Sequence, residues 1–151
     1  MKLAEALIER AELQKQNAQL IDRIKKNAKV QEGDNPAENP SDLIEQYNQN
    51  MARFYELVTA INKTNNVTSF DENLTVSDAI AKRDALGTKI KAYREIYQAA
   101  TITVDRYSKN EIRFVRSLDI KELQEQINQF SKEFRELDTK LQGLNWVTSL
   151  L

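Results

Sequence analysis

The sequence predicts a mainly α-helical protein, a bundle of four long antiparallel helices with one β-hairpin inserted between the third helix and the fourth. Only three glycines and two prolines occur among 151 residues, as is typical of long helices rather than of turn-rich β folds. Apolar residues recur at steps of three and four along four stretches, which is the spacing of a coiled-coil-like seam between helices. The period changes to two within residues 101–118, which predicts the hairpin.

The chain has the length of one helical domain, which we expect to span residues 1–151. We expect helices over residues 2–28, 41–62, 76–100 and 120–142, and the hairpin over residues 101–118.

The first two helices differ in how regular their apolar stripes are. Amides such as Asn17 interrupt the stripe of the first helix, and a buried amide there would fix the register between helices. Asn39 or Ser41 is expected to cap the second helix, with Pro40 in its first turn. The stripe of the second helix comprises Ile44, Tyr47, Met51, Phe54, Val58 and Ile61.

The fourth helix has the most regular stripe and is therefore expected to be central to the core. Asp119 is its expected N-cap and Gly143 its expected C-terminal cap. Gly87 interrupts the third helix, for which a close approach of two helices is one reason. The stripe of the fourth helix comprises Ile120, Leu123, Ile127, Phe130, Phe134, Leu137, Leu141 and Leu144.

The hairpin has a predicted register. A three-residue loop with Asn110 in the left-handed conformation would place Val104 opposite Phe114. On the other face of the hairpin it would pair Asp105 with Arg113, which carry opposite charges.

Composition excludes several kinds of chemistry. The chain has no cysteine and no histidine, which removes disulfides, thiolate nucleophiles, serine triads and imidazole-ligated zinc or di-iron sites. An oxygen-ligand metal site and a Lys, Glu or Tyr acid–base pair stay open. The acidic residues near Glu32 and Asp34 lack the spacing of a calcium loop, so we expect a solvated loop there. For the chain as a whole we expect no metal, no cofactor and no catalytic residue.

Charge and hydropathy indicate where in the cell the protein is expected and which classes of partner it is expected to bind. Lysine and arginine number 22 against 23 for aspartate and glutamate, so no overall field attracts nucleic acid or an anionic membrane. Acidic residues interrupt the apolar runs near the amino terminus, and no stretch reaches the ~20 apolar residues that span a bilayer. These features predict a cytoplasmic protein without a membrane partner.

The predicted hairpin contains the candidate ligand-binding residues Arg106, Tyr107, Arg113 and Arg116. Arginines held on strands can bind a carboxylate or phosphate through two parallel hydrogen bonds. In the structural alternative, which we prefer, Arg113 pairs with Asp105 while Arg106 and Arg116 border an apolar face over the end of the bundle.

The predicted hairpin also resembles a sequence motif of a small bacterial family of uncharacterised proteins that are often labelled septicolysin. The resemblance is carried by the segment from Asp105 to Arg116, with similar pieces at residues 1–7, 27–33, 136–142 and 145–146, and it covers essentially the whole chain. It implies a compact, mainly helical protein, with no established activity, cofactor or catalytic residue. The label suggests a pore-forming toxin, against which the absence of a membrane-length segment and of barrel-forming hairpins argues.

Two functional hypotheses follow. In the first, the chain is a non-enzymatic interaction or structural protein that forms a homo-oligomer, because helices of about 25 residues, ~37 Å long, expose much lateral surface. In the alternative, it is a small-ligand or anion-binding protein or an enzyme that uses the arginines of the hairpin. Nucleic acid binding ranks third, since the basic patch is too narrow for a phosphate backbone.

Overall fold

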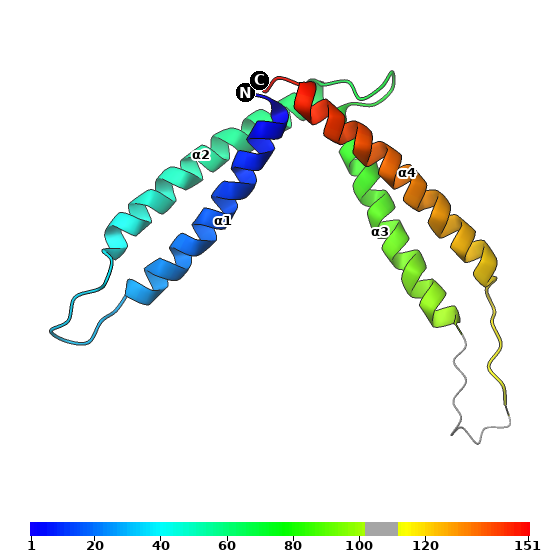
Figure 1. Cartoon of the computed structure of the whole chain (residues 1–151), viewed down its shortest axis with the longest axis horizontal. Coiled ribbons are helices and arrows are strands. Elements are labelled where there is room, and N and C mark those ends of the chain that lie inside the picture. The colour runs from blue at the N-terminus through cyan, green and yellow to red at the C-terminus, as the bar shows by residue number, and fades with distance from the viewer. Residues whose placement is uncertain (102–111) are drawn as a thin grey trace. The chain divides into compact units, whose positions relative to one another are not determined.

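The mainly α-helical class is confirmed by the computed structural model, which describes residues 1–101 and 112–151 (Figure 1). The helices in the described residues are α1 (Leu3–Asn27), α2 (Pro40–Val67), α3 (Val76–Ala100) and α4 (Ile120–Val147). Two of them run past their expected ends. The asparagine-rich segment after Ile61 continues α2, where Thr64 is buried, and α4 passes through Gly143, which is therefore not its cap.

Helix starts agree with the local sequence signals. The side chain of Asn39 accepts a hydrogen bond from the Ser41 amide at 3.0 Å, so Asn39 caps α2, with Pro40 in the first turn. The carboxylate of Asp119 accepts hydrogen bonds from the amides of Lys121 and Glu122 at 2.9 and 3.2 Å. Both caps satisfy donors that the first helical turn leaves free.

The chain divides into two compact units that each contain an antiparallel helix pair, and the packing of all four helices into one bundle stays a prediction. The first unit comprises Met1–Ser77 with Gln142–Leu151, and the second Asp78–Leu141. In Figure 1, α1 lies along α2 and α3 lies along α4. Each seam is a stripe wide enough to cover one neighbouring helix. The single domain over residues 1–151 stays a prediction.

The α1/α2 pair buries a seam whose positions alternate in steps of three and four. On α1 the seam comprises Leu3, Ala6, Arg10, Leu13, Asn17, Leu20, Ile24 and Asn27, all buried or half-buried. On α2 it comprises Leu43, Tyr47, Asn50, Phe54, Leu57, Ile61 and Thr64. The stripe expected for α2 is shifted by one position at half of its residues, so Ile44 and Met51 remain 45% and 37% exposed.

An amide pair lies at the centre of this seam. Asn50 donates a hydrogen bond to Oδ1 of Asn17 at 3.0 Å, and Nδ2 of Asn17 donates to the sulfur of Met51 at 3.4 Å. Asn17 is only 7% exposed. A shift of one helix along the other would separate the two amides and bury both without partners, so the pair fixes the register.

The C-terminal segment closes the first unit at the start of α1. The amide of Leu3 donates to the carbonyl of Thr148 at 2.9 Å, and the amide of Leu150 donates to that of Met1 at 3.0 Å. Nearby, the hydroxyl of Thr64 accepts from the amide of Leu151 at 3.0 Å. Leu150 packs against the buried cluster of Leu3, Ala6, Leu57 and Ile61, so the apolar C-terminal segment is docked on the first unit.

The α3/α4 pair has an aromatic seam. The rings of Tyr93 and Phe130 meet edge to face with centroids 5.2 Å apart. Arg83, a seam position that the sequence analysis missed, pairs with Asp138 across the helices at 3.0 Å. A Cβ at Gly87 would lie 3.4 Å from the Phe134 ring, so the helices do approach closely there.

The predicted β-hairpin is wrong for the residues that the structure describes, which contain no strand between α3 and α4. Residues 112–118 are irregular, and the Phe114 side chain is 85% exposed. Alternating β-branched residues need a third strand or a helix face to cover them, because an isolated two-stranded hairpin is marginally stable. The predicted first strand, the turn at Asn110 and the Asp105 partner of Arg113 lie outside the described residues.

Ion pairs join α1 to the start and the middle of α2. Arg53 binds both carboxylate oxygens of Glu9, at 2.7 and 3.0 Å, and Arg23 binds both of Glu38. The Arg53 guanidinium lowers the pKa of Glu9 by hydrogen bonding, and Arg23 lowers the pKa of Glu38 in the same way. Both pairs are partly exposed to solvent, so each is a modest contributor to stability.

We predict that Asn17→Ala lowers the free energy of unfolding by about 1–2 kcal/mol, because Asn50 loses its acceptor inside the seam. The double variant Asn17→Leu/Asn50→Leu should equal or exceed the native stability, since two apolar groups need no partner. Urea unfolding followed by circular dichroism measures the stability of the native chain and of both variants, and Gln14→Ala is a control that removes an exposed amide. Equal losses in the single and double variants would contradict the role given to the amide pair.

We predict a pH dependence from the two lowered carboxylate pKa values. Because both pKa values are lower in the folded state, this stabilisation is present above the unfolded carboxylate pKa and is lost as the pH falls through the folded one. Between about pH 6 and pH 3, the Glu9→Gln/Glu38→Gln variant should therefore lose less stability than the native chain. Thermal melts at each pH measure this, and Glu12→Gln/Glu45→Gln, which removes two exposed carboxylates, should follow the native curve.

Candidate functional site

The structure describes two of the four predicted ligand-binding residues. Arg113 and Arg116 are exposed and form no ion pair within the described residues. Arg106 and Tyr107 lie outside those residues. The ligand site that joins all four residues therefore stays a prediction.

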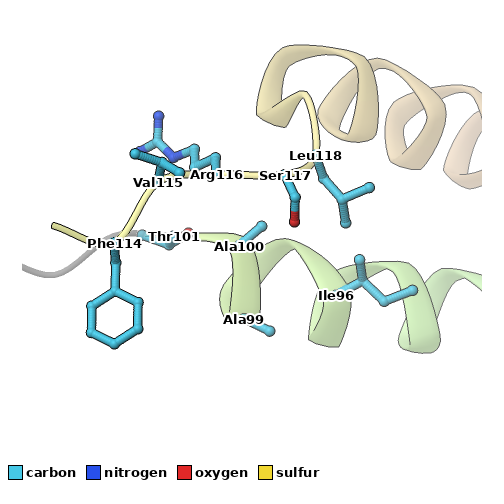
Figure 2. Close-up of a pocket in the computed structure, with 9 residues that line it drawn as sticks. All are labelled: Ile96, Ala99, Ala100, Thr101, Phe114, Val115, Arg116, Ser117 and Leu118. Atoms are coloured by element: carbon cyan, nitrogen blue, oxygen red, sulfur yellow. The ribbon is translucent and has the colours of Figure 1, made fainter. Parts of the chain in front are cut away.

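Arg116 lines a pocket of about 430 Å³ between the end of α3 and the segment that leads into α4 (Figure 2). In Figure 2 the side chains of Leu118 and Ile96 point toward each other across this space, whereas the Arg116 guanidinium points away from α3. Apolar groups thus form much of the wall. The residues lining the pocket are Ile96, Ala99, Ala100, Thr101 and residues 114–118.

A polar groove lies along one side of the α3/α4 pair. It consists of two adjoining hollows of about 300 and 410 Å³, which share Arg94, Ser131 and Arg135. Buried Ile90 and Ile127 belong to its lining. Two guanidinium groups, a hydroxyl and an apolar base are thus brought together by residues that lie about 40 positions apart in the sequence.

One face of the α1/α2 pair is apolar. Leu7 and Ile21 flank one edge of the α1 seam, and Ile44, Met51 and Val58 flank the matching edge of the α2 seam. In an antiparallel pair, residues that directly follow a seam residue on one helix lie on the same side of the pair as residues that directly follow a seam residue on the other helix. We define the apolar face by eight residues, Leu7, Ala11, Ala18, Ile21, Ile44, Met51, Tyr55 and Val58, with Gln14 as a polar neighbour at the same edge.

The opposite face of the same pair is charged. Glu9 and Arg53 directly precede seam positions, and their ion pair shows that these two edges lie together. Arg53 also binds Glu56 at 3.3 Å. The charges gather on one side of the pair, which leaves the other side without an ion pair among the described residues.

Other kinds of site are not found in the described ranges. Those ranges contain no group of three or more side chains of the metal-binding types placed to share an ion. None of their helices combines the length and apolar character that crossing a bilayer requires.

Sequence reasoning missed both the groove and the apolar face. One usable signal was Arg94, which has no acidic residue three or four positions away on its helix and therefore no local ion pair. Ile44 and Met51 were assigned to the seam, because a stripe wider than one seam leaves open which edge becomes buried.

Comparisons with known proteins show what the chain is similar to. A crystal structure described as that of a functionally unknown conserved protein from Corynebacterium diphtheriae is 42% identical in sequence, with a TM-score of 0.94, and the match covers 100% of this chain and 99% of that one. Curated proteins give no match. None of these findings supports the septicolysin label. A model of a family of unknown function, DUF6847, matches residues 10–150, and the chain therefore belongs to that family.

Proposed function

We propose that the protein is a non-enzymatic interaction protein that self-associates through the apolar face of the α1/α2 pair. The observation that supports this proposal is the unequal distribution of side chains around the pair. Tyr55 and Ile44 are 71% and 45% exposed on one face, whereas ion pairs occupy the other. Apolar side chains gathered on one face are typical of interaction surfaces, while isolated ones are common on any protein.

The face has the dimensions of a dimer interface. The 25 residues of α1 give a length of ~37 Å at 1.5 Å per residue. Two helices ~10 Å apart are together ~20 Å wide. A footprint of roughly 700 Å² per partner results, close to the ~800 Å² per partner of a standard stable interface.

The face is also complementary to a second copy of itself. On α1 it includes the small residues Ala11 and Ala18, and on α2 it includes the large residues Met51 and Tyr55. A two-fold axis that lies between the two copies and runs parallel to the helices places α2 of each copy over α1 of the other, and therefore the large side chains over the small ones. No buried charge has to be neutralised, since the ion pairs lie on the opposite side.

We predict that the native chain elutes as a dimer at micromolar concentration and that Ile44→Glu converts it to a monomer. A carboxylate at this position would be buried without a partner in the dimer but stays in water in the monomer. Size-exclusion chromatography with light scattering measures the mass. Ile8→Glu is the matched control, because Ile8 is 57% exposed and belongs neither to the α1 seam nor to the apolar face.

A native chain that is monomeric at these concentrations would exclude self-association. A dimer that both variants leave intact would place the interface elsewhere. Circular dichroism of both variants should show native helix content, because both positions are exposed.

The predicted site at Arg106, Tyr107, Arg113 and Arg116 is a second candidate, favoured by the pocket that Arg116 lines. If this pocket binds a phosphate-bearing ligand, Arg116→Ala should abolish binding and change stability by less than about 0.5 kcal/mol, since the side chain is exposed. Melting temperatures with and without sodium phosphate measure both effects. A variant that is destabilised without any effect of phosphate would show that the arginine is structural.

A further inference from the structure

We infer that the groove between α3 and α4 binds a small amphipathic anion, in which a phosphate or carboxylate is attached to a flat apolar group. The anionic group would lie between Arg94 and Arg135, and the apolar group would cover the base of the groove. All of the lining residues belong to α3 and α4, so this site is independent of the proposed self-association face.

Among the described residues, the two arginines of the groove have no ion-pair partner, in which they resemble Arg113 and Arg116 and differ from three other arginines of the helices. Arg23, Arg53 and Arg83 each bind a carboxylate. Within the described residues, neither Arg94 nor Arg135 has an ion-pair partner. The nearby carboxylate of Asp138 is already bound by Arg83 at 3.0 Å. Two unneutralised guanidinium groups at one groove favour an anion there, because each can offer two parallel hydrogen bonds to it.

The other walls supply hydrogen bonds that a polar head group can use. Ser131 lines both hollows between the two arginines, and the amides of Gln98, Gln124 and Asn128 line the larger one. Within the described residues, two of these three amides are joined by a hydrogen bond, which Gln124 donates to Asn128 at 2.9 Å. Hydroxyl and amide groups can both donate to oxygen atoms of the ligand.

The base of the groove is apolar. Ile90 and Phe134 line the smaller hollow together with Gly87, and a Cβ at position 87 would lie 3.4 Å from the Phe134 ring. Glycine at this position therefore adds no side chain to the hollow beside Phe134. Both hollows lie within the ~300–1,000 Å³ range of small-ligand sites.

Phenyl phosphate, benzoate and inorganic phosphate are suitable probes, titrated into the full ¹⁵N-labelled chain at constant ionic strength and followed by amide chemical shifts. The inference predicts saturable shifts along α3 and α4 with phenyl phosphate or benzoate, and the tighter of the two identifies the head group. Inorganic phosphate should bind about tenfold more weakly or worse, because it leaves the apolar base uncovered.

Two variants test the two halves of the site. Arg94→Gln/Arg135→Gln should weaken binding of the aromatic anion at least about tenfold. Gly87→Leu should do so without any change in charge, because it adds a large side chain to the lining of the smaller hollow beside Phe134. The control Lys82→Gln/Lys132→Gln removes two exposed positive charges from α3 and α4 outside the groove and should keep the native affinity.

Several outcomes would overturn the inference. The absence of saturable binding of both aromatic anions excludes the site. Equal weakening by the lysine control shows a general charge effect. Loss of binding in Arg116→Ala but not in Arg94→Gln/Arg135→Gln moves the site to the segment before α4. A monomeric native chain, by contrast, would exclude the proposed self-association and leave this inference unaffected.

Discussion

The pairing of each helix with one antiparallel neighbour along a single seam is the constraint on which the rest of the structure depends. A seam with steps of three and four uses about two positions in every seven, so the positions beside it stay at the surface. On the α1/α2 pair, these flanking positions are charged along one edge and apolar along the other. On the α3/α4 pair, the same rule places Gly87 and Arg94 at one edge and opens the groove between them.

Polar residues within the seams give this arrangement its specificity. Asn17 and Asn50 satisfy each other in the α1/α2 seam, and Arg83 of the α3 seam reaches Asp138 on the facing helix. An entirely apolar seam would be at least as stable but could slide by one heptad with little loss of contact. Register matters for both proposed surfaces, since a slide would separate the large residues of α2 from the small residues of α1 and would move Arg94 away from Arg135.

The groups that lie at the described surface are suited to binding. Arg94 and Arg135 have no ion-pair partner among the described residues, and their guanidinium groups are permanently charged and suited to holding an anion. The apolar face and the groove are therefore the two described surfaces from which a function of this family can be tested.

The sequence by itself determined the helical class, the cap at Asp119 and the stripe of α4, and it limited the cap of α2 to Asn39 or Ser41. These features depend on local hydrogen bonds and on the helical period, which the chain contains without reference to distant residues. Only the tertiary structure decided that Leu43 and Asn50, rather than Ile44 and Met51, face α1, that residues 112–118 form no strand, and that Arg94 and Arg135 share one groove. Each of these outcomes depends on a partner far away in the sequence. An apolar stripe that is wider than the seam does not specify which of its edges becomes buried. A strand forms only where another part of the fold covers it. Whether an arginine lacks an ion-pair partner depends on which carboxylates the fold brings near it.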